Sequence, residues 1–313
     1  MYHRFGTVDV LQWEEIGRPT LGSGQAWIHI RAVSLNLLDA YVRSGRMGSL
    51  VSNQFPKIPG ADFSGVVAAV APDIRGLAVG EQVFGTFDPL VGGALAEGVV
   101  IAASTLAAKP KTLSFMQAAA VPFAGLAALQ AVRDLAQLKS GDALLVHGAS
   151  SGLGLFAIQL AKRVGAHVTA VAATSALPAL LTAGADVLID SSCEDDRFDS
   201  QRYDAILNSE SALSFDRAQS YLKPSGRFLV PWPMMSQSDA FELPHQIVPS
   251  KRHLVLHPVV RANDLAFLGS LIDAGGLEVT VARVYGREEV QEGYRQLEGG
   301  SSVGKIVINL DGR

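Results

Sequence analysis

The sequence is poor in cysteine, in aromatic residues and in net charge. Its 313 residues contain a single cysteine, Cys193, which excludes an internal disulfide framework and a zinc lobe built from several thiolates. The formal net charge of -4 gives no general attraction to nucleic acid or to an anionic membrane. The N-terminal stretch carries acidic residues and lacks the apolar core of a signal peptide, so we expect a soluble, cytoplasmic protein.

One uncharged stretch, residues 113–132, is long enough to span a bilayer. Gln117, Pro122, Gly125 and Gln130 interrupt it, which favours a pair of buried helices over a membrane span. The chain is about twice as long as a typical single domain, and two domains are therefore expected.

The chain up to about residue 110 predicts many short strands and few helices. Residues 26–33 alternate apolar and polar side chains as a half-buried strand does, and residues 63–70 and 82–85 look similar. Glycine and proline separate these segments. This part is expected to form a β-barrel or a sandwich.

Beyond residue 116 the pattern changes to strands that alternate with helices. After an Ala- and Leu-rich segment, strands are predicted at residues 143–146, 167–173, 187–189, 205–207 and 228–230. In the first intervening helix Ala157, Leu160, Ala161 and Val164 predict an apolar face. This alternation is typical of βαβ units and a parallel sheet. A helix at 264–274 and a strand at 305–308 follow, and residues 231–249 predict the longest loop.

A glycine cluster, "VHGASSGLG" at residues 146–154, joins the first of these strands to its helix. Gly148 permits a sharp turn, Gly152 lets backbone N–H groups approach a pyrophosphate, and Gly154 lets the helix pack close to the sheet. The helix N-terminus and the two serine hydroxyls add hydrogen-bond donors. The residues predicted to bind a dinucleotide here are Gly148, Ser150, Ser151, Gly152, Leu153 and Gly154. A glycine turn without a ligand remains the alternative.

Two other glycine-loop families are excluded. A P-loop would need Gly-Lys-Ser/Thr, which does not follow. Short-chain dehydrogenases carry a similar loop near the N-terminus together with a Tyr-x-x-x-Lys pair. Here the loop begins at residue 148, and none of the six tyrosines is followed by lysine four residues later.

The choice of nucleotide depends on the residues after the second strand. An NAD site normally has Asp or Glu about 20 residues beyond the glycines, but residues 143–185 contain no acid. Thr174 and Ser175, at the end of that strand, would not repel a 2′-phosphate. NADPH is therefore predicted as the cofactor, although no basic residue follows the strand either.

Together these segments resemble the zinc-independent quinone oxidoreductases of the medium-chain dehydrogenase/reductase superfamily. The resemblance implies an α/β protein, with a GroES-like β-barrel domain at residues 1–117 and 256–313 and a Rossmann domain at residues 118–255. It also implies a homodimer. The segments that carry it are "VSLNLLDAYVRSG" (33–45), "IPGADFSGVV" (58–67), "GGALAEGVVI" (92–101), "FMQAAAVPFAGLAALQAV" (115–132), "GDALLVHGASSGLGLFAIQLAKRVGAHV" (141–168) and "GSSVGKIVINL" (300–310).

The resemblance implies a reaction without zinc. Asn36 and Ala61 stand where the alcohol dehydrogenase branch has its first cysteine and its histidine. The pair His253-x-x-x-His257 lacks an evident third ligand, so no metal is predicted. Without zinc, hydride must go to an acceptor that is already activated, such as a quinone or another conjugated carbonyl.

Asn36, Asp39 and Tyr41 match the family positions that line the substrate site. We hypothesise that Tyr41 or Asn36 donates a hydrogen bond to the substrate oxygen, while Asp39 holds this segment in shape. The alternative is purely structural, with Asn36 as the N-cap of a short helix and Asp39 at its third position.

The chain departs from the family at several positions near the expected cofactor. Ala127 replaces a common threonine, and residues 175–178 lack the basic residue that often follows the second strand. Residues 208–211 replace an Asp-x-Val-Gly-Gly segment, and residues 230–234 replace a glycine-ended strand. Within the latter, Trp232 either walls the substrate pocket or fills a rigid loop.

Two further residues have a structural and a chemical interpretation. Cys193 lies beside three acids, which disfavour its thiolate, so a solvated loop residue is preferred over a nucleophile. Lys305 fits a structural salt bridge as well as a catalytic role.

Three functions therefore remain open. The first is an NADPH-dependent reductase of quinones or other conjugated carbonyls. The second is a reductase of the carbon–carbon double bond in enones, enals or enoyl thioesters. The third is a nucleotide-binding sensor or partner protein with little catalysis.

Overall fold

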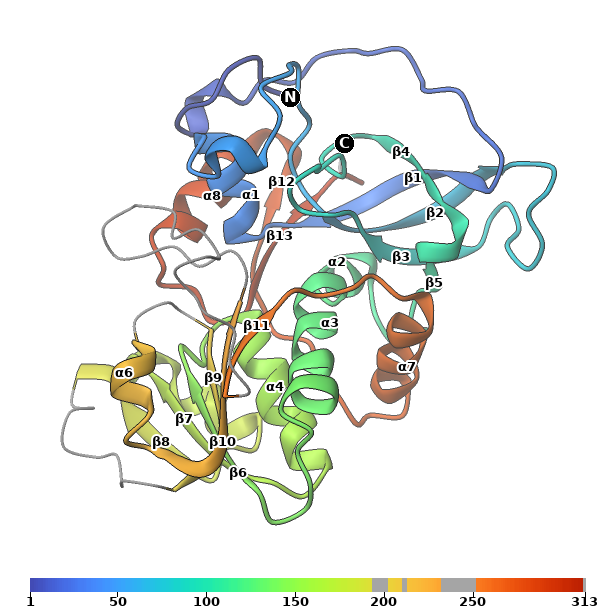
Figure 1. The fold of residues 1–313 in the computed structure, drawn as a ribbon. Coiled ribbons are helices and arrows are strands. Elements are labelled where there is room, and N and C mark those ends of the chain that lie inside the picture. Colours follow the sequence, from blue (N-terminus) through green and yellow to red (C-terminus); the bar gives the residue numbers. More distant parts are fainter. Residues whose placement is uncertain (193–201, 210–212, 232–251, 312–313) are drawn as a thin grey trace. The chain divides into compact units, whose positions relative to one another are not determined.

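The computed structural model describes residues 1–192, 202–209, 213–231 and 252–311 (Figure 1). The chain divides into two compact units, one formed by Met1–Phe123 with Val260–Arg313 and the other by Ala124–Val259. Both junctions lie a few residues later than the predicted limits after residues 117 and 255. The first unit is thus assembled from two segments that are far apart in sequence.

A seven-stranded sheet organises the described part of the first unit, in the order β12-β13-β1-β2-β3-β5 with β4 paired to β1. Along β1 the side chains of Ala26, Ile28 and Ile30 are buried, as the alternating pattern predicts. The elements of this unit are β1 (Gln25–Ser34), α1 (Leu37–Ser44), β2 (Asp62–Val70), β3 (Gln82–Thr86), β4 (Gly98–Ala102), β5 (Ala107–Ala108), α2 (Phe115–Ala119), α7 (Ala262–Asp273), β12 (Val281–Gly286), α8 (Val290–Glu298) and β13 (Lys305–Asn309).

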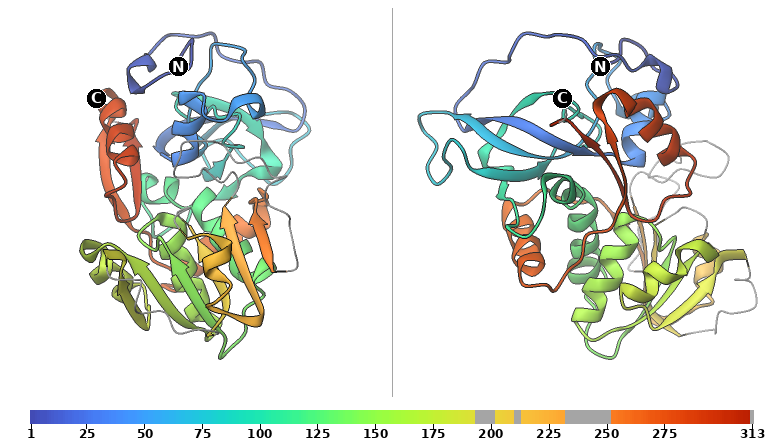
Figure 2. Two further views of the ribbon diagram at one scale, coloured as in Figure 1. Left: turned by 60° about the vertical axis from the view of Figure 1, so that its left-hand side comes forward. Right: turned by 180° about the vertical axis from the view of Figure 1, so that it is seen from behind.

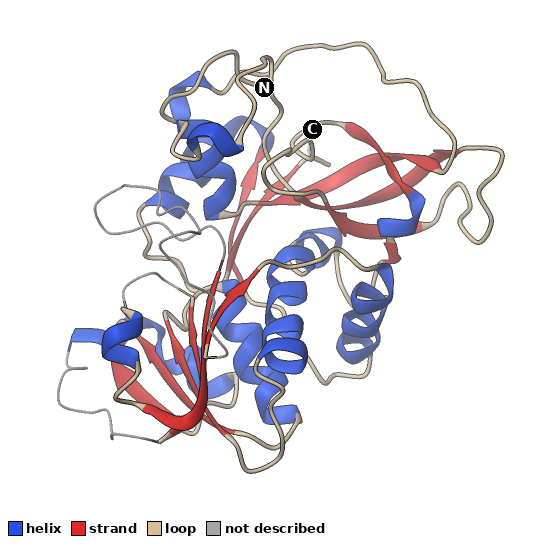
Figure 3. Ribbon diagram, viewed as in Figure 1, coloured by secondary structure: helices blue, strands red, loops and turns tan. Residues whose placement is uncertain are grey.

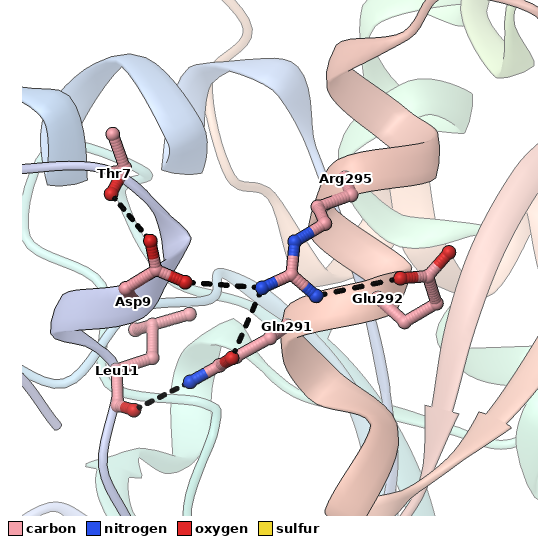
Figure 4. Close-up of polar contacts among 6 residues, drawn as sticks. All are labelled: Thr7, Asp9, Leu11, Gln291, Glu292 and Arg295. Carbon is pink, nitrogen blue, oxygen red and sulfur yellow. Dashed lines mark hydrogen bonds and ion pairs between the residues drawn. The ribbon is translucent and has the colours of Figure 1, made fainter.

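The two segments of the first unit are joined in the sheet and at a surface helix. Strand β13 pairs with β1, so that Val33 lies opposite Ile308. In α8, Arg295 contacts the carboxylate of Asp9 at 3.1 Å, and Gln291 donates to the carbonyl of Leu11 at 3.2 Å (Figure 4). These exposed polar contacts add little energy each, and the buried strand pairing is the main connection.

The second unit is built on a parallel sheet, with strand order β11-β10-β9-β6-β7-β8 (Figure 2). Its strands alternate with helices along most of the chain (Figure 3). This is the order of dinucleotide-binding folds, in which ligands bind where the order reverses, here between β6 and β9. The elements are α3 (Pro122–Gln130), β6 (Ala143–His147), α4 (Gly152–Arg163), β7 (His167–Ala172), α5 (Leu177–Thr182), β8 (Val187–Asp190), β9 (Tyr203–Asn208), α6 (Phe215–Ala218), β10 (Leu222–Pro231) and β11 (His253–Leu256).

The expected α/β class and the parallel sheet are confirmed. The uncharged stretch at 113–132 forms the predicted helix pair, α2 and α3, which continues into a π-helical turn at Ala131–Leu135. Within the described ranges, none of the helices combines the length and apolarity that a bilayer crossing requires.

Helix α4 packs against β6 and β7 through an apolar face that includes Ala157, Leu160 and Ala161. The prediction that Val164 belongs to this face was wrong, because its side chain is 39% exposed at the residue that caps the helix. Ser151 is the N-cap residue of the helix, and its hydroxyl accepts from the N–H of Gly154 at 3.0 Å.

Gly154 lies where the first turn of α4 meets the loop after β6. A Cβ atom there would lie 2.5 Å from the carbonyl oxygen of Ala149 and 2.7 Å from its Cα. Both are backbone atoms, so the helix would have to move. The close approach that the sequence predicts for Gly154 is therefore a packing requirement of the loop.

We expect Gly154→Ala to lower the free energy of unfolding by about 1–3 kcal/mol, the usual cost of overpacking. Urea unfolding followed by circular dichroism measures this. Gly17→Ala is the control, because a Cβ at Gly17 meets nothing within 4 Å. Equal unfolding free energies for the two variants would contradict the packing role.

Candidate functional site

The glycine loop follows β6 at the point where the strand order of the second unit reverses. Gly148 has a φ of 72°, in the left-handed region that favours glycine. The N–H of Ala149 donates to the carbonyl of Val171 in β7 at 2.9 Å, which fixes the loop to the neighbouring strand. The six residues predicted to bind the dinucleotide, Gly148 and Ser150 to Gly154, thus lie together in one turn and the start of α4.

Ser209, the first residue after β9, contacts this loop from the neighbouring strand on the side opposite β7. Its hydroxyl lies 2.8 Å from the carbonyl of His147 and 2.5 Å from that of Gly148. The hydroxyl of Ser151 lies 3.4 Å from that of Ser209. Sequence reasoning missed this contact, although the hydroxyl sits in the segment that departs from the family pattern.

Asn208, also in that departing segment, is fully buried at the end of β9. Its Nδ2 donates to the carbonyl of Leu213 at 2.8 Å. The amide therefore connects the end of β9 to Leu213, the residue before the N-cap of α6. Within the departing segment, Ser209 thus bonds to the glycine loop, whereas Asn208 bonds to Leu213.

Thr174 and Ser175 are exposed in a 3₁₀ turn, Thr174–Ala176, directly after β7. The hydroxyl of Thr174 is hydrogen-bonded to Oδ2 of Asp190, the last residue of β8. Sequence reasoning missed Asp190, because it considered acids only up to residue 185, about 20 residues beyond the glycines. The signal that could have identified Asp190 is an acid at the end of the next predicted strand.

The residues of this edge fit a dinucleotide. Gly152 and Leu153 occupy the first turn of α4, where N–H groups have no partner within the helix and the helix dipole favours an anion. The absence of a side chain at Gly154 lets this first turn lie against the backbone of Ala149 in the glycine loop. A nicotinamide dinucleotide could be held by these backbone groups and by the serine hydroxyls.

In the first unit, Asn36 and Asp39 lie at the N-terminus of α1. Asn36 is the N-cap residue, and its backbone N–H donates to Oδ2 of Asp39 at 2.9 Å, as the capping interpretation predicts. Tyr41 lies two residues further, where a helix turns its side chain away from that of Asp39. It is half-buried, and the guanidinium of Arg46 lies 5.7 Å from its ring centre.

Asp62, the first residue of β2, is fully buried beside Asn36. Its carboxylate accepts from Nδ2 of Asn36 at 3.0 Å and from the N–H of Phe123 at 2.8 Å. The ammonium of Lys305, also buried, lies 3.4 Å from Oδ2 of Asp62 and donates to Oδ1 of Asn36. Lys305 thus forms a buried ion pair with Asp62, which is one of the two roles that the sequence left open for it. Sequence reasoning missed Asp62, which could have been identified as an aspartate at the start of a largely apolar strand.

This arrangement fixes the orientation of the Asn36 amide. Its oxygen faces the ammonium of Lys305, and one of its two N–H groups faces the carboxylate of Asp62. An amide nitrogen carries two hydrogens, so one N–H remains for another acceptor. Asn36 as a whole residue is 8% exposed.

Asp39 is buried on the opposite side of α1 from Tyr41. Burial raises the pKa of its carboxyl to about 7, the bond from the N–H of Asn36 opposes this, and the charge of Asp62 adds to it. The other carboxylate oxygen, Oδ1, is buried without a hydrogen-bond partner. Asp39 therefore sits in the interior as a helix-capping group rather than at the surface.

His253, whose pairing with His257 was considered as a metal site, lies in β11. His253 stacks on Phe215 at 4.6 Å between ring centres, and burial lowers its pKa. Among the residues whose placement is described, no three His, Cys, Asp or Glu side chains gather as a metal site would require. Cys193 and Trp232 lie outside the described residues, as do residues 210 and 211 of the departing segment.

Comparisons with known proteins agree over nearly the whole chain. Residues 22–111 match the alcohol dehydrogenase GroES-like domain, and residues 183–308 match a family described as zinc-binding dehydrogenase. The mitochondrial NAD(P)H oxidoreductase RTN4IP1 of Mus musculus is 30% identical over 320 residues, which cover 90% of this chain and 81% of that protein.

Two further comparisons concern reductases. The 2-methylene-furan-3-one reductase of Solanum lycopersicum is 29% identical over 319 residues, covering 98% of this chain and 78% of that protein. The structure of the quinone oxidoreductase from Coxiella burnetii superimposes with a TM-score of 0.86 at 30% identity, covering 99% of this chain and 98% of that one.

We expect Lys305→Met to lower the free energy of unfolding by about 3–5 kcal/mol, because it leaves the buried carboxylate of Asp62 without its cation. Urea unfolding measures the loss. Adding Asp62→Asn to Lys305→Met removes the uncompensated charge and should restore part of the stability. A double variant that loses the sum of the two single losses would contradict this explanation.

We expect Asp39→Asn to change how stability depends on pH. The native carboxyl keeps its proton up to about pH 7, whereas the unfolded one loses it near pH 3.8. The unfolded state therefore binds fewer protons in this interval, and the free energy of unfolding of the wild type falls as the pH rises through it. Between pH 5 and pH 8 the variant should gain about 3 kcal/mol relative to the wild type, at 1.36 kcal/mol per unit.

Urea unfolding at these two pH values tests the expectation for Asp39. Asp216→Asn serves as the control, because Asp216 is an exposed residue in the first turn of α6. Parallel pH profiles for the wild type and Asp39→Asn would show that the carboxyl of Asp39 ionises alike in both states.

Proposed function

Because the chain belongs to the medium-chain dehydrogenase/reductase superfamily, we propose that it is a metal-independent reductase of quinones or other conjugated carbonyls. The observation that carries the proposal is the glycine loop, which lies at the strand-order reversal of a parallel sheet and fits a dinucleotide. The names of the relatives, an NAD(P)H oxidoreductase and a quinone oxidoreductase, support the same class of reaction.

We propose NADPH as the reductant. The end of β7 carries Thr174 and Ser175 and no acid, so nothing in that turn itself excludes a 2′-phosphate. The first turn of α4, with Gly152 and Leu153, would hold the pyrophosphate. When bound, the reduced nicotinamide supplies a hydride.

The first unit supplies hydrogen bonds to the acceptor oxygen. Addition of hydride to a conjugated carbonyl places negative charge on that oxygen, as an enolate or a hydroquinone anion. The remaining N–H of Asn36 and the hydroxyl of Tyr41 are the donors that we propose for this charge. Lys305 and Asp62 act through Asn36, because they fix the direction of its amide.

The proposal needs no metal. Asn36 and Ala61 occupy the positions at which the resemblance places a cysteine and a histidine ligand, and neither side chain is a zinc ligand of the usual kinds. Both are buried, and Asn36 already has polar partners within the protein. A conjugated acceptor is activated enough to accept hydride with hydrogen bonds alone.

Reduction of a carbon–carbon double bond is the second candidate. The similarity to a 2-methylene-furan-3-one reductase favours it, since the name describes a conjugated enone. The two reactions share the hydride and the charged oxygen and differ in the product. Incubation with NADPH and a quinone, an enone or an enoyl thioester separates them, because the products are a hydroquinone or a saturated carbonyl compound.

The first test is a titration of the purified protein with NADPH and with NADH, before any acceptor is chosen. Binding is measured by the fluorescence of the reduced nicotinamide. Saturable binding with subsequent turnover of a conjugated acceptor is the expected result. Binding without turnover of any acceptor would favour a sensor protein. Absence of binding of either nucleotide would overturn the reductase proposal.

We expect Tyr41→Phe to lower turnover about 100-fold, the effect of losing one hydrogen-bond donor to a developing oxyanion. The dissociation constant of the cofactor should not change, because Tyr41 is not among the residues proposed to bind it. Tyr221→Phe in the second unit is the matched control. Unchanged turnover in Tyr41→Phe would remove Tyr41 from the mechanism.

A further inference from the structure

Three neighbouring strands of the second unit end at the same edge of the sheet. Strands β6, β7 and β8 are parallel, with His147 opposite Val171 and Ala172 opposite Asp190. The glycine loop, Thr174 and Asp190 therefore emerge side by side. Asp190 reaches the turn after β7 from the next strand, although it is 16 residues away from Thr174 in the chain.

The carboxylate of Asp190 is held in place by donors from two segments. Oδ2 accepts from the hydroxyl of Thr174, and Oδ1 accepts from the N–H of Ser192 at 2.9 Å and from its hydroxyl at 2.7 Å. The carboxylate is therefore fixed next to Thr174. The sequence predicts no acid at the end of β7, yet the carboxylate of Asp190 lies there.

The contact also determines what the Thr174 hydroxyl can offer. A hydroxyl has one proton, and that of Thr174 is used by Asp190, so Oγ1 is left as an acceptor. A 2′-phosphate carries only acceptors and negative charge at neutral pH, so the Thr174 hydroxyl cannot donate to it while it is bonded to Asp190. A ribose 2′-hydroxyl is a donor, and it can bond to Oγ1 of Thr174 or to the carboxylate.

We propose that Asp190 and Thr174 together form the subsite for the 2′ position of the adenosine ribose, and that Asp190 weakens NADPH binding enough for NADH to be accepted as well. This inference rests on the proposed function, since it requires a nicotinamide dinucleotide at the glycine loop. Dinucleotide sites that bind NADH use an acid after the second strand for the 2′-hydroxyl. In this chain the third strand, β8, supplies that acid.

The test is a titration of wild type and variants with NADH and with NADPH, without acceptor, read by nicotinamide fluorescence and by calorimetry. We expect wild-type dissociation constants for the two nucleotides within about tenfold of each other. Asp190→Asn should tighten NADPH binding about tenfold, equivalent to about 1.4 kcal/mol, and weaken NADH binding about threefold. Asp190→Ser, which also keeps an acceptor for Thr174, should shift the ratio in the same direction.

Asp142→Asn is the matched control, because Asp142 precedes β6 at the opposite edge of the same sheet. Its ratio of dissociation constants should equal that of the wild type. If both Asp190 variants bind the nucleotides with the wild-type ratio, Asp190 does not act on the 2′ position and the inference falls. A wild type that prefers NADPH more than about 100-fold would also overturn it. If no variant and no wild type binds either nucleotide, the proposed function itself fails.

Discussion

A carboxylate with no exposed surface, that of Asp62, is held by donors from three separate parts of the first unit. They are the amide of Asn36 at the start of α1, the N–H of Phe123 at the end of the unit's first segment, and the ammonium of Lys305 in β13. Burial of a charge is tolerated only when such partners are all in place. The position of the Asn36 amide, and with it the proposed acceptor site, therefore depends on the correct assembly of both segments of this unit.

In the second unit, neutral hydrogen-bonding groups from neighbouring strands hold the glycine loop in place. The hydroxyl of Ser209 holds the carbonyls of His147 and Gly148, and the N–H of Ala149 holds the carbonyl of Val171. The glycine loop is thus fixed from the strands on both sides of β6. A loop with little freedom loses little entropy when a phosphate binds, and it presents its N–H groups in one direction.

Local patterns in the sequence predict local structure well here. The alternation in β1, the glycine turn and the N-cap at Asn36 each depend on residues within one element, and the structure contains all of them. The contacts that shape the sites join residues far apart in sequence, with separations of 243 for Lys305 and Asp62 and 61 for Ser209 and Gly148. Such pairs follow from the strand order, which alternation and motif spacing do not determine. Asp190 was missed for this reason, since only the order β6-β7-β8 brings it beside Thr174.

The division of the first unit into two segments has a consequence for how the protein is made. The ribosome synthesises Asn36 and Asp62 early, then the whole second unit, and only then Lys305. Until that strand emerges, the Asp62 carboxylate has no cation and β1 has no β13 to pair with. The nascent first unit is therefore incomplete throughout translation of the second, and a chaperone that shields an unfinished sheet would find its substrate in that interval.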